Sequence, residues 1–375
     1  MFKKPFSNYL FFLAILFLIG YVATTLRGIH EYAGWLLMAS LLLAALAIRR
    51  YELLKGYSFT IMIFAAVSVA MYYPDYFISI GDFKLSRTIT PFMQIIMFGM
   101  GTSLSLKDFA GVIKMPKGVI AGLLCQFTIM PFMALLITKI FNFPNEVAAG
   151  IILMGSCPSG LASNVMTYLA RANLALSVSL TAIATLVAPI VTPFFMELLA
   201  GQYVAIDFWA MVWDITKIVI IPVTAGLIFN QFLHGKFKVI DNIMPLLSMG
   251  GIVLIIVVIT AAGRDNLLDV GALLILAVLM HNVTGYFLGY WSGRLLRMDE
   301  RDCRTIAIEV GLQNAGLGSA LALAMNKLST VGLAAAIFAP VMNITGSSLA
   351  LWWRGKPLPE DNPSKKEVAI QDASS

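Results

Sequence analysis

The feature that most constrains this chain is a series of twelve apolar stretches, each close to the ~20 residues that a helix needs to cross a ~30 Å hydrocarbon core. They occupy residues 8–26, 32–48, 57–74, 88–106, 117–141, 145–170, 173–200, 206–233, 238–263, 267–293, 303–326 and 329–353. Only 12% of the residues are charged, against about 25% in an ordinary soluble domain. The sequence therefore predicts an all-α polytopic membrane protein, and it argues against a soluble enzyme or a nucleic-acid-binding module.

Lysine and arginine are distributed unequally between the two sides of the membrane that these spans define. When successive loops are assigned to alternate sides, most basic residues fall on the side of both termini. Basic loops face the cytoplasm in membrane proteins, so we expect cytoplasmic termini and a location in the inner (plasma) membrane of the cell. Lys3 and Lys4 precede the first apolar run as in a signal peptide, but no convincing cleavage site follows, and we predict a retained helix.

The predicted spans divide into an N-terminal pair and two blocks of five. We predict two extra spans at 1–56, a first repeat at 57–200, a second repeat at 206–354 and a disordered cytoplasmic tail at 355–375. Because five is odd, the two blocks enter the membrane from opposite sides, which is typical of the inverted repeats of secondary transporters. Similar residues recur at an offset near 150, where Asn164 matches Asn314 and Pro189 matches Pro340. The predicted core is therefore a ten-span pair of inverted five-span repeats.

Each predicted repeat contains one span through which a regular helix cannot continue. In the first repeat, Pro158 stands among glycines and small hydroxyl residues at 155–164. Proline removes a backbone donor and clashes with the preceding turn, and irregular backbone at membrane depth must be satisfied by protein or a watery cavity. The corresponding segment of the second repeat, 309–316, is again rich in glycine and polar residues. Two broken helices at corresponding places indicate a transport site where they cross.

Polar side chains gather in and around these two segments. Glu309 is a carboxylate in a stretch, 305–326, that has no other charge, and an intramembrane carboxylate is costly and by default functional. The other members are amides and hydroxyls, namely Gln126, Asn164, Gln313, Ser163, Ser177 and Thr181. Together they form an all-oxygen set with one carboxylate. Such a set suits a dehydrated monovalent cation better than calcium or a transition metal.

Purely structural interpretations of these polar residues remain open. Glu309 could be interfacial, because Arg304 is only five residues away. Gln126 could bond a neighbouring helix, and hydroxyls inside helices often bond the preceding turn. Asp214 and Lys217, three residues apart, are interpreted as a structural ion pair rather than a hinge contact.

Four motifs resemble the signatures of the bile acid:sodium symporter family. They are Gly-Ser-Cys-Pro-Ser-Gly-Leu-Ala-Ser-Asn-Val-Met-Thr-Tyr-Leu-Ala-Arg at 155–171, Glu-Val-Gly-Leu-Gln-Asn-Ala-Gly-Leu at 309–317, Ile-Met-Phe-Gly-Met-Gly at 96–101 and Gln-Phe-Thr-Ile-Met-Pro at 126–131. The resemblance covers about 57–354. It implies ten core spans in a five-plus-five inverted repeat, a panel domain and a core domain, and two broken helices that cross near the midplane.

The resemblance also implies two sodium sites and a substrate site. The first sodium site would be formed by Ser163, Asn164, Ser177, Thr181 and Glu309. The second would use Gln126, Gln313, Glu309 again, and backbone carbonyls near Val310 and Leu312. The substrate would lie near Ser159, Leu161, Asn314, Met342 and Asn343. Around Ser159–Leu161 and Met342 the chain departs from several bacterial relatives, so the resemblance does not imply which substrate is bound.

These observations predict a sodium-coupled symporter of a small organic anion that works by alternating access. Half-helices beginning after each break would direct their positive N-terminal ends toward the anion. A proton-coupled carrier that uses Glu309 is the alternative. We predict no enzyme, because His281 is expected to be a hydrogen-bonded span residue and no metalloprotease or hydrolase motif is present. The expected partners are two co-transported sodium ions, the organic anion and lipid. Neither a nucleic acid nor a protein partner is implied.

Overall fold

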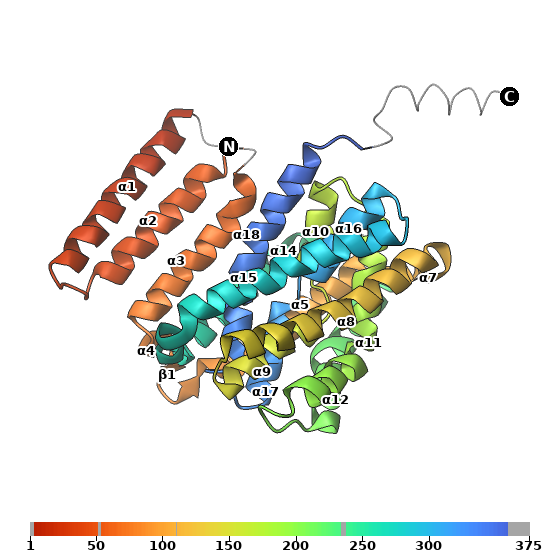
Figure 1. Ribbon diagram of the computed structural model, residues 1–375. Helices are drawn as coiled ribbons and strands as arrows, with labels where there is room; N and C mark the ends of the chain where they lie inside the picture. Colours follow the sequence, from red (N-terminus) through yellow and green to blue (C-terminus); the bar gives the residue numbers. More distant parts are fainter. Residues whose placement is uncertain (1–3, 52–53, 110, 234–237, 359–375) are drawn as a thin grey trace.

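The computed structural model describes residues 4–51, 54–109, 111–233 and 238–358, and nearly all of them are helical (Figure 1). Most of the predicted tail, residues 359–375, lies outside the described residues, as do the loop residues Lys3 and Lys236. At one flank of the molecule α1 (Lys4–Leu26), α2 (Ala33–Ile48) and α3 (Ser58–Tyr72) stand side by side. Hydroxyl groups join them, since Ser40 donates to the carbonyl of Ala14 and Ser58 donates to that of Ala45, each at 2.8 Å.

The remaining elements follow in two series. The first series holds η1 (Lys55–Tyr57), α4 (Asp75–Ile78), β1 (Ser79–Ile80), β2 (Phe83–Lys84), η2 (Leu85–Thr88), α5 (Ile89–Ser103), α6 (Leu106–Phe109), α7 (Gly111–Lys114), α8 (Pro116–Phe141), α9 (Asn145–Ser156), α10 (Ala162–Leu169), α11 (Leu174–Phe195) and η3 (Met196–Ala200). The second series holds α12 (Phe208–Ile215), η4 (Thr216–Ile220), α13 (Ile221–Leu233), α14 (Lys238–Ala262), α15 (Arg264–Leu295), α16 (Glu300–Gly311), α17 (Ala315–Ala324) and α18 (Gly332–Arg354). Several bounds agree closely with the predicted stretches, for example α8 with 117–141.

One small element departs from the all-α prediction. Strands β1 and β2 form a two-residue antiparallel hairpin, in which Ile80 pairs with Phe83. The turn between them contains Gly81 with a φ of 57°, a left-handed conformation that glycine adopts without steric cost. Because these strands are so short, no periodicity in the sequence reveals them.

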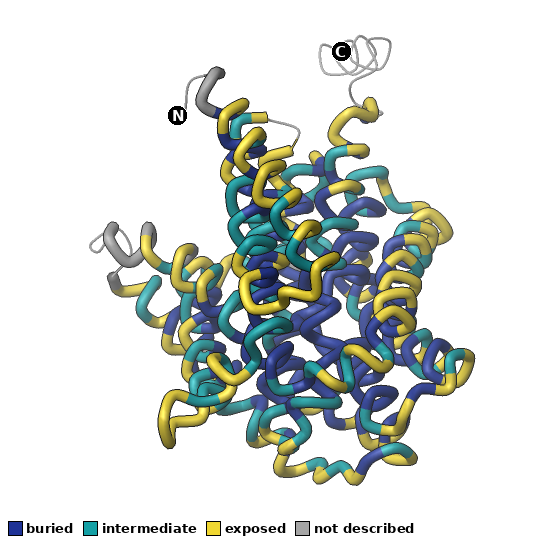
Figure 2. The backbone as a smooth tube through the Cα atoms, turned by 90° about the vertical axis from the view of Figure 1, so that its left-hand side faces the viewer, coloured by how far each residue is buried: buried dark blue, intermediate teal, exposed yellow. Residues whose placement is uncertain are grey.

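The helices are long, apolar and exposed in the way that a lipid environment requires. Seven helical segments of the described residues are long and apolar enough to cross a membrane, namely Ser7–Leu26, Lys55–Tyr72, Pro116–Phe141, Leu174–Ala200, Phe208–Phe232, Arg264–Leu295 and Gly332–Arg354. Figure 2 shows buried residues in the centre of the molecule and exposed ones around it. Large apolar side chains such as Phe12, Trp209 and Phe232 are among the exposed residues. The protein is therefore a multi-pass membrane protein.

Two pairs of consecutive helices are each separated by a short non-helical connection. Helix α9 ends at Ser156 and α10 begins at Ala162, while α16 ends at Gly311 and α17 begins at Ala315. The two extended connections pair with each other in an isolated antiparallel bridge between Ser159 and Gln313. The amide of Gly160 donates to the carbonyl of Leu312 at 3.2 Å, and that of Asn314 donates to the carbonyl of Pro158 at 2.9 Å. Each connection thus satisfies backbone groups of the other. Irregular backbone inside a membrane protein needs such partners, because no water is available there.

A row of glycines lets α15 approach α16 closely. A Cβ added at Gly285 would lie 3.0 Å from the Cα of Gly311, and one at Gly289 would lie 3.0 Å from the Cα of Ala307. Gly293, one turn further, would meet Cys303 in the same way. Small residues spaced four apart allow backbones in a membrane to pack at short range. The glycine row therefore fixes α16, and with it one of the two connections, against the long helix α15.

Four polar residues of the predicted spans have structural partners. The carboxylate of Asp214 and the ammonium group of Lys217 form an ion pair at 2.8 Å, which agrees with the structural interpretation. His281 is buried, and its Nε2 lies 2.8 Å from the carbonyl of Met130, so it is hydrogen-bonded as predicted. Arg304, at the start of the predicted stretch 303–326, is only 2% exposed. Its guanidinium is compensated by Glu300, one turn earlier in α16, at 2.8 Å.

Candidate functional site

The carboxylate of Glu309 lies in the centre of the molecule among hydroxyl groups. It is 3% exposed, so it is buried inside the protein. Ser159 donates to its Oε2 at 2.6 Å, and Thr181 Oγ1 lies 3.1 Å from Oε1 and 3.0 Å from Oε2. Ser177 donates to Oε1. These donors come from the first connection and from α11, and Glu309 comes from α16, so the two series of helices meet at one carboxylate.

Asn164 and Ser163 complete this group. The Oδ1 of Asn164 accepts a hydrogen bond from Ser177 at 2.8 Å, and the hydroxyls of Ser163 and Thr181 lie 3.2 Å apart. The structure therefore brings together all five residues predicted for the first cation site. They offer one carboxylate, one amide oxygen and three hydroxyl oxygens within a buried space.

The residues predicted for the second cation site form a separate chain of hydrogen bonds. Gln126 Nε2 donates to the carbonyl of Cys157 at 2.9 Å and to Gln313 Oε1 at 2.7 Å. Gln313 Nε2 in turn donates to the carbonyl of Val310 at 2.7 Å. The remaining oxygen of Gln126, Oε1, is buried and accepts no hydrogen bond from the described residues. Since buried acceptors are rarely left unsatisfied, this oxygen is a candidate ligand for a cation.

The chemistry of both groups fits a hard monovalent cation. No cluster of three or more His, Cys, Asp or Glu side chains occurs in the part of the chain that the structure describes. Calcium usually recruits several carboxylates, and softer metals recruit imidazole or thiolate ligands. One carboxylate surrounded by neutral oxygens instead provides a single negative charge, which one or two alkali ions can share.

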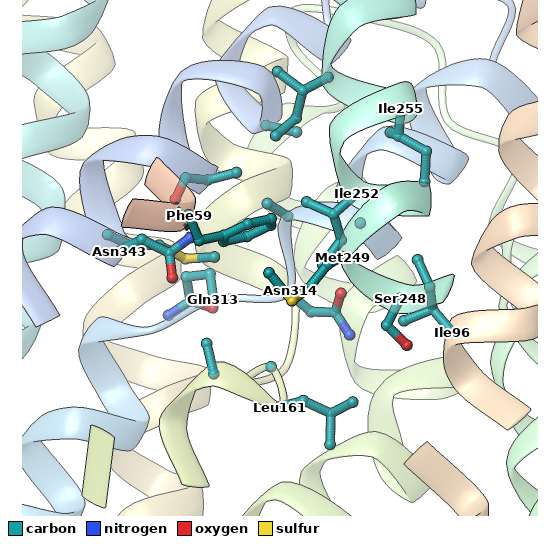
Figure 3. A pocket seen from close by; sticks show the side chains of 18 of the residues that line it. Phe59, Ile96, Leu161, Ser248, Met249, Ile252, Ile255, Gln313, Asn314 and Asn343 are labelled. Atoms are coloured by element: carbon teal, nitrogen blue, oxygen red, sulfur yellow. Dashed lines mark hydrogen bonds between the residues drawn. The ribbon is translucent and has the colours of Figure 1, made fainter. Parts of the chain in front are cut away.

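A cavity of about 410 Å³ lies beside the two connections (Figure 3). On one side it is bounded by α3, α5 and α14, which contribute apolar residues such as Phe59, Ile96 and Ile252. On the other side are the connections with α10, α17 and α18. Four of the five residues predicted to contact substrate line this cavity, namely Leu161, Asn314, Met342 and Asn343. The fifth, Ser159, is not among the lining residues, because it lies against Glu309.

The two asparagines of the cavity are held differently. Asn314 is the N-cap of α17, and its Oδ1 accepts a hydrogen bond from the amide of Leu317 at 3.0 Å. Asn343 Nδ2 donates to Ala339 in its own helix at 2.8 Å, and no described residue donates to its Oδ1. Asn314 therefore has a structural task as well as a place in the cavity, whereas the amide of Asn343 bonds only its own helix among the described residues.

One group of residues was not predicted as part of the site. Asn282 on α15 donates through Nδ2 to the carbonyl of Gly311 at 2.7 Å, where α16 ends. Thr345 on α18 donates to Asn282 Oδ1, and the hydroxyl of Tyr286 lies 3.2 Å from that of Thr345. The network therefore satisfies the carbonyl of Gly311, which has no partner within α16 because the helix ends there. Gly311 lies between Val310 and Leu312, the two residues predicted to bind a cation through their carbonyls. The signal in the sequence was an asparagine inside an apolar span.

Contacts also join these four helices away from the two connections. At one end of the molecule Glu146, in the first turn of α9, pairs with Lys327, which follows α17. At the other end Asn173 Nδ2, beyond α10, donates to Asp302 of α16 at 2.7 Å. Both pairs join the first series of helices to the second. The two series are therefore joined at Glu309, between Glu146 and Lys327, and between Asn173 and Asp302.

Comparison with known proteins agrees with this geometry. A sequence model of the Sodium Bile acid symporter family matches residues 90–270. The uncharacterized sodium-dependent transporter YocS of Bacillus subtilis (strain 168) is 40% identical over 310 residues, 82% of this chain and 94% of the relative. The probable sodium/metabolite cotransporter BASS1, chloroplastic, is 37% identical in Arabidopsis thaliana (70% of this chain, 65% of the relative) and 34% identical in Oryza sativa subsp. japonica (80% and 73%). The chain belongs to the sodium bile acid symporter family.

Proposed function

We propose that this protein is a symporter that couples the entry of sodium ions to the transport of a small organic anion. The names of its relatives describe sodium-dependent transport and sodium/metabolite cotransport. The observation that carries the proposal is the buried carboxylate of Glu309, surrounded by hydroxyl and amide oxygens that meet from both series of helices. In this role sodium is cargo rather than a resident cofactor.

The first sodium ion would bind between Glu309 and the group formed by Ser163, Asn164, Ser177 and Thr181. Hydroxyl donors compensate the carboxylate in the structure. A cation can replace these donors, because each hydroxyl can rotate and present a lone pair instead. Binding would therefore need little movement of the backbone. The carboxylate charge would be neutralised by an ion instead of by hydrogen bonds.

The second sodium ion would bind near Gln126 and Gln313, with the carbonyls of Val310 and Leu312 and the carboxylate of Glu309. The unpaired Gln126 Oε1 supports this assignment. Because Glu309 would serve both ions, loss of its charge should weaken both sites. The ions would also hold the two connections together, since their ligands come from both.

The anion would occupy the cavity beside the connections. No Lys, Arg or His side chain is among its lining residues in the described part of the chain. A negative group would therefore depend on neutral donors, on the N-terminal ends of α10 and α17, and on the nearby sodium ions. Met93, Met97 and Met249 are among the apolar residues that line the cavity, and methionine side chains adapt their shape to an occupant. These features favour an anion whose charge is small relative to its apolar body.

Transport would proceed by alternating access between two inverted repeats of five spans. Helices α3, α5 and α12 to α14 would form one domain, and α8 to α11 with α15 to α18 the other, with the cavity between them. In Figure 1 the beginning of α1 and the end of α18 lie at the same end of the molecule. This agrees with an even number of crossings, and the distribution of basic residues would make that end cytoplasmic. The two domains would rock against each other once the ions and the anion are bound.

The test is thermal unfolding of the detergent-purified protein in sodium against potassium, for wild type and Glu309→Gln. A ligand that binds only the folded state stabilises it by about 2.7 kcal/mol at a hundredfold excess over Kd. We expect sodium alone to raise the midpoint of wild type and to have no effect on Glu309→Gln. Equal effects of both salts on both proteins would contradict the sodium sites. In proteoliposomes, uptake driven by a pH gradient without sodium would favour the proton-coupled alternative.

A further inference from the structure

A second cavity lies in a groove between α15 and α18, and Tyr286 and Thr345 are among its lining residues. Its volume is about 830 Å³. Phe287 and Trp291 of α15 and Trp352 of α18 line it, and these side chains are 60%, 49% and 58% exposed. In a membrane protein such exposed aromatic side chains face lipid, so the groove opens sideways into the bilayer rather than toward the transport site.

The groove changes character along its length. Val283 and Ile344 line the part nearest the middle of the two helices. Trp291 and Trp352 follow, and Glu300, Arg304 and Lys356 line the end. Helix α15 ends at Leu295 and α18 at Arg354, so the charged part of the groove lies where both helices end. Tryptophan and basic residues at helix ends are typical of the level of the lipid headgroups.

Of the charged residues that line this end of the groove, Lys356 has no carboxylate partner among the described residues. Glu300 accepts hydrogen bonds from Arg304 Nε at 2.8 Å and from the hydroxyl of Tyr290 at 2.9 Å. Arg304 also donates to the carbonyl of Trp353 at 3.1 Å, so its position is fixed. The ammonium group of Lys356 lies 5.3 Å from the centre of the Trp352 ring, and it forms no ion pair with a described residue. A positive charge therefore stands above an apolar groove.

We propose that this groove binds an anionic phospholipid of the leaflet on the side of the termini. The phosphate would lie near Lys356, whose charge is not neutralised by a neighbouring carboxylate of the described residues. An acyl chain would follow Trp291, Phe287 and Val283 toward the middle of the membrane. The order of groups in the groove, from cationic through aromatic to aliphatic, matches the order of groups in a phospholipid. A basic residue near an anionic membrane surface contributes about 1 kcal/mol, which corresponds to about a fivefold change in affinity.

The test uses tryptophan fluorescence, because three of the six tryptophans line the groove or its end. In the full chain, Trp35, Trp209 and Trp213 are replaced by Phe, so that Trp291, Trp352 and Trp353 remain. The protein is placed in nanodiscs that contain either brominated phosphatidylglycerol, which is anionic, or brominated phosphatidylcholine, which is zwitterionic. Bromine on the acyl chain quenches a tryptophan that it contacts.

We expect phosphatidylglycerol to quench these tryptophans more than phosphatidylcholine at the same mole fraction. Lys356→Gln should reduce this preference about fivefold. Arg354→Gln is the matched control, since it removes the same charge two residues earlier but outside the groove, and it should leave the preference intact. Equal quenching by the two lipids, quenching by neither, or equal effects of both substitutions would overturn the proposal. Unchanged unfolding midpoints show that the variants are folded.

Discussion

The hydroxyl of Ser159 and the carboxylate of Glu309 form a hydrogen bond of 2.6 Å, although 150 residues separate them in the sequence. The backbone of Ser159 also pairs with Gln313 in the bridge between the two connections. One residue of the first connection thus bonds the second connection and the carboxylate at the end of α16. Ser159 therefore lies among the hydroxyl groups around Glu309 and is not among the residues that line the cavity.

Ser159→Ala should destabilise the sodium-free protein and spare the sodium-bound one. A hydrogen bond to a charged group contributes about 1.5–3 kcal/mol, and its loss leaves the buried carboxylate short of a donor. A bound sodium ion would compensate that loss, so sodium should raise the unfolding midpoint more in the variant than in wild type. Ser156→Ala is the control, because the hydroxyl of Ser156 bonds Ile152 in its own helix. An equal loss of stability in sodium and in potassium would contradict this prediction.

Gln126→Leu should remove the second ion and leave the first. The substitution deletes the unpaired Oε1 and the two hydrogen bonds to Cys157 and Gln313. If two ions bind cooperatively, the dependence of anion uptake on sodium concentration is sigmoidal, and it should become hyperbolic when one site is lost. Thr128→Val changes a hydroxyl on the exposed side of the same helix and should leave the curve unchanged. A sigmoidal curve in Gln126→Leu would argue against the second site.

Asn343→Ala should weaken binding of the anion without weakening the fold. Its Nδ2 donates one N–H to its own helix, and the second N–H of this cavity-lining amide has no acceptor among the described residues and can donate to the anion. Loss of one hydrogen bond of about 0.5–1.5 kcal/mol corresponds to an increase in KM of about two- to tenfold. Transport measured at saturating sodium tests this, together with the unfolding midpoint.

Asn314 should behave differently from Asn343, because it also caps α17. Loss of an N-cap costs about 1 kcal/mol of stability, so Asn314→Ala should lower the unfolding midpoint as well as the affinity for the anion. Asn314→Ser retains an oxygen that can cap the helix, and it should recover stability but not affinity. A variant that recovers both would show that only the cap matters.

Asn282→Leu should destabilise the end of α16. It removes the donor that satisfies the buried carbonyl of Gly311, and an unsatisfied buried acceptor costs about 1–3 kcal/mol. We expect a lower unfolding midpoint and a weaker response to sodium, since Val310 and Leu312 flank this carbonyl. Thr345→Val leaves the bond between Asn282 and Gly311 in place and should have the smaller effect. A larger effect of Thr345→Val would contradict the prediction that the bond between Asn282 and Gly311 is the main stabilising contact of this network.

The helices were largely predictable from the sequence because lipid imposes a minimum length and an apolar composition on each span. Helix α8, for example, begins and ends within one residue of the predicted stretch. The end of α9 at Ser156, just before Pro158, was predictable for a local reason, since proline among glycines does not continue a helix. The association of Ser163, Ser177 and Thr181 with Glu309 followed from the chemistry of their oxygens and from the family resemblance.

Other parts of the site depend on contacts that no local pattern records. Asn282 lies on α15, and nothing near it in the sequence indicates which carbonyl it will satisfy. The burial of Arg304 could have been suspected from Glu300 four residues earlier, but its bonds to Ala170 and Trp353 come from distant helices. The position of Ser159 differs from the expectation that it lines the cavity, because its hydroxyl bonds Glu309 instead.

The bridge between Ser159 and Gln313 makes the two connections a single cooperative unit. The amide of Gly160 is protected only while Leu312 is in place, and the amide of Asn314 only while Pro158 is in place. Neither strand of this bridge has another strand to pair with in the described residues. Hydrogen exchange at the two amides should therefore occur through one opening event, so the centre of the molecule either holds as a whole or opens as a whole.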